Sequence, residues 1–348
     1  MKLTLTTAAL AVALLSLSAC KTAEQAVPPN TLVAAKVAAA PNPALGAADP
    51  AWARAKALSV PLSGGANFGG KGETTATLKA VHAGDTLYLL VQYADPTHSL
   101  RRGAYQKQAD GTWKQLKDPA NKGGDENVYY EDKWAFIWPI GNSIKKFEAE
   151  GCAAMCHEGQ GKPYGNKYTS SEGELGDIWH MKLARTVPNG LADDQYVDHT
   201  RYDPKASPNA GRKNEPGAPN GDYTAFALVD GKPPFMAGDA KPLNAGGTAW
   251  VKRGTEVAFD DARFKANDEV ASYFVNPIQG DRADVRVAVT WKDGMYTSVI
   301  SRKLVTGSRF DVQFSDLSAR YGFGFAAFDN AQVRHATGDD ALFLTFQR

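Results

Sequence analysis

The stretch TATLKAVHAGDTLYLLVQY, residues 75–93, decides the fold class. In its second half, every second residue from Leu87 to Tyr93 is apolar, a period of two that is typical of a strand with one buried face. The residues at 82–85, between the two halves, are small or polar, as in a short turn. The stretch therefore predicts a β-hairpin.

The same alternation recurs in the last third of the chain. Further strands are expected at 284–291, 295–304, 320–328 and 341–348. The turn KDG at 292–294 joins the first two of them. Short strands joined by turns of this kind are typical of a mainly β protein with an antiparallel β-sandwich.

The middle of the chain, about 141–282, has a different character. It is rich in Gly, Pro, Asn and Asp, above all in RYDPKASPNAGRKNEPGAPNGD at 201–222. A few short helices are expected there, with 143–157 as one candidate. Because long connections in a β domain commonly carry its site, we interpret this region as a loop-rich, partly helical insertion that holds the functional residues.

The N-terminus has the features of a lipoprotein signal. An apolar core and small residues fill positions 1–19, and Leu17-Ser18-Ala19-Cys20 matches the bacterial lipobox. The alternative is an ordinary signal peptide with a chance cysteine. We expect Cys20 to be acylated, 20–47 to be a flexible tether rich in Ala and Pro, and 48–348 to be the folded domain. Export would place that domain in the oxidising periplasm.

Overall charge argues against a nucleic-acid partner. The chain has 39 basic and 38 acidic residues and a net charge of +1, without the basic excess that a phosphate backbone attracts. After the signal region, no stretch approaches the roughly 20 apolar residues that span a bilayer. We therefore expect membrane association only through the lipid anchor.

Two cysteines and a histidine gather in GCAAMCHEGQG, residues 151–161. In the usual signature of covalent c-type haem, C-x-x-C-H, both thiols form thioethers with the porphyrin and the histidine binds iron. Here Cys152, Cys156 and His157 follow the pattern with one extra residue between the thiols. We expect one covalent haem c, with His157 as the proximal iron ligand.

Three other interpretations of these thiols stay open. A disulfide between Cys152 and Cys156 is geometrically feasible, but it would close a very small loop and leave His157 unexplained. A zinc site needs four ligands, and no second Cys/His pair with matching spacing exists. A redox thiol pair usually has two intervening residues and a thioredoxin-like βαβ context.

Several blocks of the sequence resemble the ethylbenzene dehydrogenase-related haem-binding domain, which includes the haem subunits of type II dimethyl-sulfoxide-reductase-like enzymes. The blocks are TLYLLVQYADPTHSL (86–100), EDKWAFIWPI (131–140), GCAAMCHEGQG (151–161), GDIWHMKLARTVPNGLADDQYVD (176–198) and YGFGFAAFDNAQVRH (321–335). The resemblance implies an immunoglobulin-like or CBM9-like sandwich that carries one haem and transfers electrons.

The resemblance also implies where this chain departs from the enzyme subunits. In those subunits a methionine and a lysine bind a non-covalent b-type haem. Cys152, Cys156 and His157 have no counterpart there, so the chain resembles the c-type cytochrome branch of the family. A molybdenum-containing partner does not follow from the resemblance.

The second iron ligand has three candidates. The family topology implies a ligand late in the chain, which favours His335 in a polar loop between the closing strands. Met236, beside two prolines, is the second choice, and His180 in DIWHMKLAR is the third. Near His180, the cations Lys182 and Arg185 are candidates to pair with haem propionates, and Trp179 is a candidate to pack on the macrocycle.

We therefore expect a single-haem c-type cytochrome, lipid-anchored on the periplasmic face of a bacterial membrane, that transfers electrons and is not itself an enzyme. Its expected partners are redox proteins, such as a periplasmic oxidoreductase or a quinol-oxidising complex. Two alternatives remain. One is a ligand- or carbohydrate-binding β-sandwich lipoprotein with a structural disulfide. The other is a haem sensor with an open sixth position.

Overall fold

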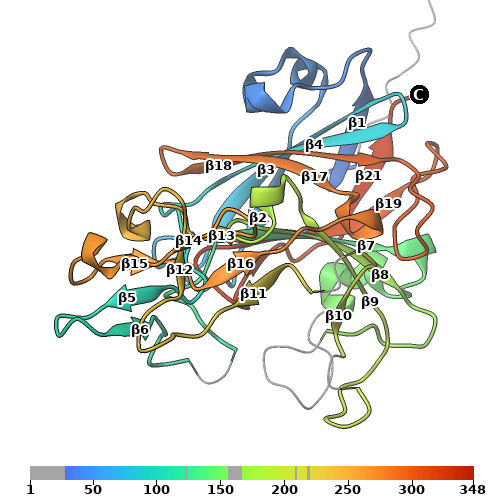
Figure 1. Cartoon of the computed structure of the whole chain (residues 1–348). Helices are drawn as coiled ribbons and strands as arrows, with labels where there is room; N and C mark the ends of the chain where they lie inside the picture. Colours follow the sequence, from blue (N-terminus) through green and yellow to red (C-terminus); the bar gives the residue numbers. More distant parts are fainter. Residues whose placement is uncertain (1–27, 122–123, 156–166, 208–209, 218–219) are drawn as a thin grey trace, which may run out of the picture.

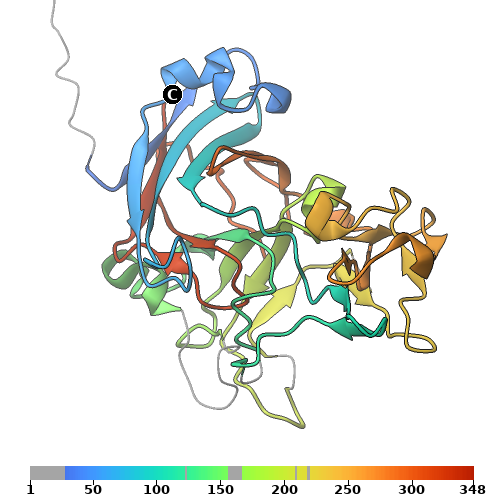
Figure 2. The same ribbon diagram turned by 90° about the vertical axis from the view of Figure 1, so that its left-hand side faces the viewer.

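The computed structural model describes residues 28–121, 124–155, 167–207, 210–217 and 220–348. Within them, 13 strands form one continuous sheet in the order β10-β9-β8-β7-β19-β21-β1-β3-β4-β18-β17, with β2 on β3 and β20 on β19 (Figures 1 and 2). These strands are β1 (Thr31–Lys36), β2 (Leu58–Leu62), β3 (Thr74–Ala83), β4 (Thr86–Ala94), β7 (Lys133–Pro139), β8 (Gly176–Lys182), β9 (Asp193–Val197), β10 (Arg212–Asn214), β17 (Arg286–Lys292), β18 (Met295–Lys303), β19 (Tyr321–Phe328), β20 (Ala336–Thr337) and β21 (Leu342–Phe346).

The sheet forms a sandwich because β19 belongs to both of its halves. One edge of β19 pairs with β21 and the other with β7, both antiparallel. Leu89 of β4 and Phe136 of β7 then lie in the same buried apolar cluster, although their strands belong to opposite halves. The indole Nε1 of Trp134 in β7 also donates to Ser298 Oγ of β18 at 3.0 Å. The expected mainly β sandwich is confirmed.

The β-hairpin expected at 75–93 forms. Strands β3 and β4 pair antiparallel from Ala76 and Tyr93 to Ala83 and Thr86. Gly84 in the turn has a φ of +57°, which a residue without a side chain adopts at little cost. The alternating residues from Leu87 to Tyr93 are buried in the core. Burial of that single apolar face fixes the register of the hairpin.

The expected tether at 20–47 needs correction, because Thr31–Lys36 forms a central strand. β1 lies between β21 and β3 and is parallel to both. Leu32 and Ala34 are almost completely buried in the main core. The Ala-rich composition was misleading here, since small apolar side chains fit a strand that has neighbours on both sides. The folded domain therefore begins before residue 48.

The expected insertion at 141–282 also needs correction. Two of its segments, β8 and β9, are members of the main sheet. All seven residues of β8 are buried, so the strand lacks the alternation by which the other strands were found. A separate lobe projects from one side of the sandwich (Figures 1 and 2). Its strands are β5 (Tyr105–Lys107), β6 (Trp113–Gln115), β11 (Tyr223–Ala225), β12 (Phe235–Met236), β13 (Val251–Lys252), β14 (Val257–Ala258), β15 (Glu269–Val270) and β16 (Tyr273–Val275).

Helices are short. The candidate helix at 143–157 is instead α1 (Phe147–Glu150) followed by the 3-10 turn η4 (Gly151–Ala154), with a break at Gly151, whose φ is +57°. The other 3-10 turns are η1 (Pro43–Ala48), η2 (Pro50–Arg54), η3 (Ile140–Asn142), η5 (Val187–Asn189), η6 (Leu243–Ala245), η7 (Asp261–Arg263) and η8 (Gly280–Ala283). In the described residues, none of the helices has the length and apolar character to cross a membrane.

Candidate functional site

The outer face of β7, β8 and β19 is the place where the expected site residues meet. Side chains alternate along β7, so Trp134 points into the core while Lys133 and Ala135 face outward. In register, Ala135 lies between His180 of β8 and Ala326 of β19. Two alanines beside a histidine leave a hollow on this face, because their side chains do not fill the space above the sheet.

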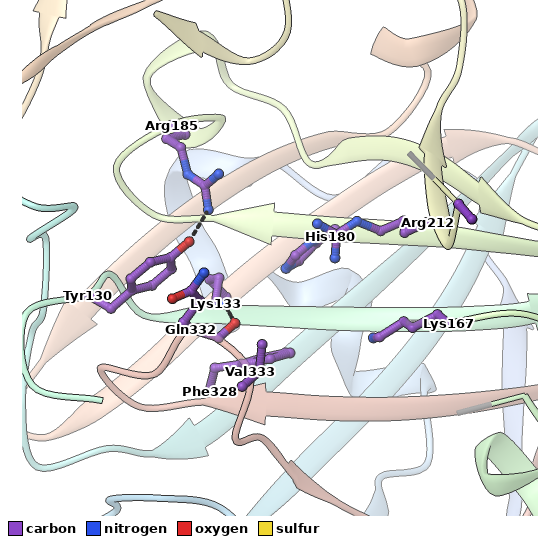
Figure 3. A pocket seen from close by; sticks show the side chains of 10 residues that line it. Tyr130, Lys133, Lys167, His180, Arg185, Arg212, Phe328, Gln332 and Val333 are labelled. Atoms are coloured by element: carbon purple, nitrogen blue, oxygen red, sulfur yellow. Dashed lines mark hydrogen bonds between the residues drawn. The ribbon is translucent and has the colours of Figure 1, made fainter. Parts of the chain in front are cut away.

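A cavity of about 220 Å³ opens on this face (Figure 3). Four cationic side chains line it: Lys133, Lys167, Arg185 and Arg212. Its other lining residues are Tyr130, His180, Ala210, Phe328, Gln332 and Val333. No carboxylate belongs to this set of described residues, so the cavity suits a partly apolar ligand with negative charge.

His180 presents an unused nitrogen to this cavity. Its side chain is 2% exposed, and Nδ1 lies 3.4 Å from Gln195 Oε1. Because that oxygen accepts, Nδ1 carries the proton and Nε2 keeps its lone pair. Nε2 is buried without a hydrogen-bond partner. Burial, reinforced by Arg212 and other cations, holds the pKa of His180 well below its usual value, so the ring is neutral. A neutral, unpartnered imidazole nitrogen is suited to bind a metal.

Lys133 is a buried cation that lacks an opposite charge. Its Nζ donates to Gln332 O at 2.7 Å and lies 4.1 Å from the centre of the Phe328 ring. Among the described residues, no ion pair joins it to a carboxylate. Burial and the neighbouring Arg185 hold its pKa well below the usual value. An anionic group in the cavity would reverse this effect by stabilising the ammonium form.

The two cations expected beside the site differ in their positions. Lys182 is paired with Asp193 and, at 2.7 Å, with Asp222, and it does not line the cavity. Arg185 pairs with Glu131 and lies 3.3 Å from Asp222, yet it lines the cavity and reaches Tyr130 there. Only Arg185 is therefore positioned to meet a ligand.

Cys152 sits directly beside this cavity. The η4 turn packs on β19 at Gly324, where a Cβ atom would lie 2.8 Å from the Cβ of Cys152. Only glycine lets the turn approach the strand this closely. A smaller hollow of about 30 Å³ is lined by Cys152 and His335, and it shares Lys167 and Phe328 with the larger cavity. The thiol and both histidines therefore surround adjoining space.

His335 is engaged differently from His180. Its Nδ1 lies 2.8 Å from Val333 O, and its ring centre is 4.9 Å from that of Phe328. The carbonyl oxygen accepts, so Nδ1 carries the proton. His335 lines the smaller hollow, whereas His180 lines the larger one.

Two expected site residues lie elsewhere. Met236 packs in the lobe, in a cluster with Tyr105 and Trp113, and lines neither hollow. Trp179 points into the sandwich core beside Trp138, because its neighbour His180 takes the outward direction in β8. Both side chains are occupied by core packing rather than by the cavity.

Cys20, Cys156 and His157 lie outside the described residues. Three of the four cationic residues of the cavity, Lys133, Lys167 and Arg212, were missing from the sequence interpretation. A signal existed only for Lys133, the charged residue directly before the apolar run WAFIWPI. Nothing in the local sequence around Arg212 indicates that β10 brings it to this face.

A protein-family profile matches most of the chain. The sequence profile described as ethylbenzene dehydrogenase matches residues 49–339. No curated protein sequence matches the chain.

The similar solved structures are distant. A family 9 carbohydrate-binding module from Caldicellulosiruptor kristjanssonii in complex with cellotriose is 9% identical, with 91% of this chain and 95% of that chain covered and a TM-score of 0.32. A protein from Bacteroides uniformis, assigned to carbohydrate binding, is 10% identical, with 91% and 99% covered and a TM-score of 0.38. Neither likeness is close enough to transfer a ligand.

Proposed function

The chain belongs to the ethylbenzene dehydrogenase family, and on that premise we propose that it is a single-haem electron-transfer protein. The haem would be held on the outer face of β7, β8 and β19, attached through Cys152 and Cys156. His157 would bind the iron from one side. The observation that carries the proposal is the buried, unpartnered Nε2 of His180, which faces a cation-lined cavity beside Cys152.

The described residues fit such a group in three respects. His180 offers the neutral nitrogen that iron binds. Lys133, Arg185 and Arg212 offer the positive charge that two buried propionates require. Ala135 and Ala326, beside His180 on the outer face, leave space next to its ring, and Gly324 lets Cys152 approach the same face. We therefore place His180 ahead of His335 as the second iron ligand and no longer retain Met236.

The haem would supply a one-electron Fe(III)/Fe(II) couple. The protein's own contribution is to orient His180 through Gln195, to exclude water with Phe328, and to surround the site with cations. If His157 and His180 both bound the iron, no position would remain open for a substrate. This arrangement suits transfer of electrons to and from partner proteins, such as a periplasmic oxidoreductase, rather than catalysis by the chain itself.

A redox titration tests this function. We expect one haem per chain and a single one-electron transition followed in the visible spectrum. Lys133→Met should lower the midpoint potential by on the order of 50 mV. The oxidised haem carries one more positive charge than the reduced haem, so loss of a nearby cation stabilises the oxidised form. Lys114→Met, at an exposed lysine of β6 in the lobe, is the matched control and should leave the potential unchanged. Purified protein without a haem spectrum would contradict the proposal.

We also propose that acylated Cys20 anchors the protein to the periplasmic face of a bacterial membrane. Cys20→Ala should leave the protein exported but release it into the soluble periplasmic fraction, since the lipid is the expected anchor. Fractionation of cells by immunoblot, with a high-salt wash, measures this. A Cys20→Ala protein that stays with the membrane after the wash would exclude lipid anchoring.

A further inference from the structure

A second set of buried groups lies on the inner side of β8 and β9, away from the cavity. Asp177 of β8, Asp194 of β9 and Asp311 of the loop between β18 and β19 are completely buried. One carboxylate oxygen from each lies within 4.8 Å of the others. Three segments that are far apart in the sequence therefore bring their carboxylates to one point.

Most oxygens of this group have no hydrogen-bond partner among the described residues. Both oxygens of Asp194 are buried and unpartnered, and so is one oxygen each of Asp177 and Asp311. The adjacent Glu215, 3% exposed, adds a fifth such oxygen, Oε1. Buried polar atoms are nearly always satisfied in native proteins, so five orphaned acceptors in and beside this cluster indicate a missing positive partner.

The protein supplies only part of the required positive charge. Arg302, 2% exposed, lies 2.8 Å from Asp311 and 3.7 Å from Asp177. One guanidinium therefore forms ion pairs with two of the four carboxyl groups. Burial raises the pKa of Asp177 to about 7 and that of Glu215 to about 9. Without a further cation the cluster must bind protons, whereas a bound dication would keep the carboxylates ionised.

We propose that Asp177, Asp194 and Asp311, with Glu215 beside them, bind a hard divalent cation, for which Ca²⁺ is the best match. Ca²⁺ takes six to eight oxygen ligands in flexible geometry, and carboxylates are its preferred donors. Mg²⁺ usually keeps several waters, which a fully buried site has little room to hold. The ion would tie β8 and β9 to the loop that carries Asp311. This inference does not depend on haem binding.

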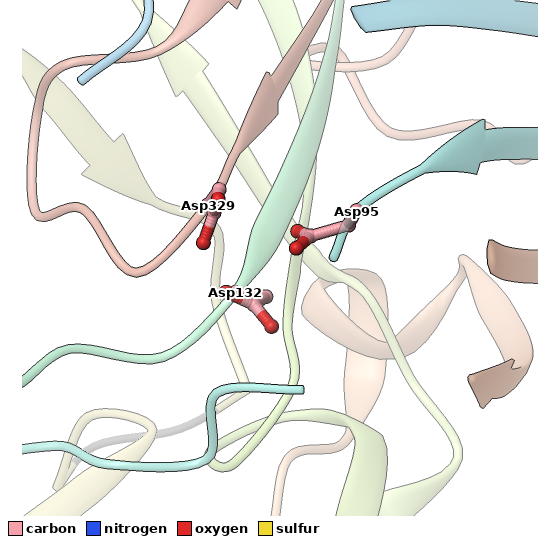
Figure 4. A group of neighbouring side chains, drawn as sticks. All are labelled: Asp95, Asp132 and Asp329. Atoms are coloured by element: carbon pink, nitrogen blue, oxygen red, sulfur yellow. The ribbon is translucent and has the colours of Figure 1, made fainter. Parts of the chain in front are cut away.

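A second buried carboxylate group gives an internal control (Figure 4). The side chains of Asp95, Asp132 and Asp329 also point toward one another, but five of their six oxygens accept hydrogen bonds. Donors to them are the backbone of Phe68, Thr97, Ser99 and Asn330 and the hydroxyls of Thr97 and Tyr296. Only Asp95 Oδ2 is orphaned, and one proton satisfies it, since burial raises the pKa of Asp95 to about 7.

The test measures Ca²⁺ directly and through stability. Full-length purified protein is dialysed against CaCl₂ or EGTA, and bound calcium is counted by atomic emission. We expect one calcium per chain. Thermal unfolding should shift upward by about 4 °C when free Ca²⁺ is 100 times its dissociation constant. Asp194→Asn should lose both the calcium and the shift, and Asp95→Asn should keep both.

Asp194→Asn separates a metal site from an empty acidic cluster. If no ion binds, burial raises the pKa of Asp194 and keeps it protonated, so its replacement by a neutral amide should leave the unfolding temperature unchanged in CaCl₂ and in EGTA. That outcome, wild-type protein without bound calcium, or a calcium effect lost only in Asp95→Asn would overturn the proposal. Should Asp194→Asn not fold, Tb³⁺ luminescence on unmodified protein decides. Trp179 Nε1 donates to Asp177 Oδ2 at 3.1 Å, close enough to excite the bound ion. Absence of Ca²⁺-displaceable luminescence would equally overturn the site.

Discussion

Replacing both Cys152 and Cys156 by alanine is expected to abolish covalent haem completely. Two thioethers survive denaturation, whereas iron ligands and packing do not. In wild-type protein the haem should stay with the polypeptide on a denaturing gel and after acid–acetone extraction. In the double variant all of it should be extracted. Alanine is tolerated sterically at position 152, because it keeps the Cβ that packs on Gly324.

The single variants and a distant cysteine serve as controls. Cys152→Ala and Cys156→Ala alone should each keep some haem through the remaining thioether. Cys20→Ala should keep the full amount. If haem from wild-type protein extracts freely, the attachment is not covalent. If haem is absent and the two thiols are joined, the disulfide interpretation with a ligand-binding sandwich takes its place.

His180→Ala is expected to leave the haem iron with an open coordination position. With a histidine on each side the ferrous protein should be low-spin and should not bind carbon monoxide. Loss of the His180 ring should give a high-spin spectrum and stoichiometric carbon monoxide binding, because no other described side chain on this face offers an unpartnered nitrogen. Added imidazole should restore the low-spin spectrum, since the vacated hollow accepts a free ring. Visible and magnetic circular dichroism spectra measure both changes.

His335→Ala is the matched control for this experiment. Its ring also contacts Phe328, so the variant removes a similar volume beside the same wall. It should leave the iron low-spin and closed to carbon monoxide. High-spin iron in His335→Ala together with an unchanged His180→Ala would return the ligand role to His335. Carbon monoxide binding by the wild-type protein would favour the sensor with an open position.

The fold was predictable wherever one face of a strand meets water. The alternation from Leu87 to Tyr93 gave the hairpin, and the closing strands followed from the same period. Strand β8 was not recognised, because both of its faces are buried and its sequence does not alternate. Strand β1 was missed for a related reason. Its small apolar residues carry little signal until β21 and β3 flank them.

The site was partly predictable from residue chemistry but not from position. The sequence identified His180 and Arg185 as candidates, yet it ranked His335 first from its place in a loop. The direction of each side chain decides this ranking, and within β8 a shift by one residue exchanges the core for the outer face. Trp179 and His180 illustrate that exchange. Arg212 and Lys133 line the same cavity although they lie almost 80 residues apart in the sequence, and no local pattern predicts this.

The most direct test is the pyridine haemochrome spectrum of wild-type protein produced together with the cytochrome c maturation machinery. It reports whether the vinyl groups of the porphyrin have been converted to thioethers. We expect the spectrum of a haem with both vinyl groups saturated, at one haem per chain. The spectrum of unmodified protohaem, or no haem at all, would contradict covalent attachment at Cys152 and Cys156.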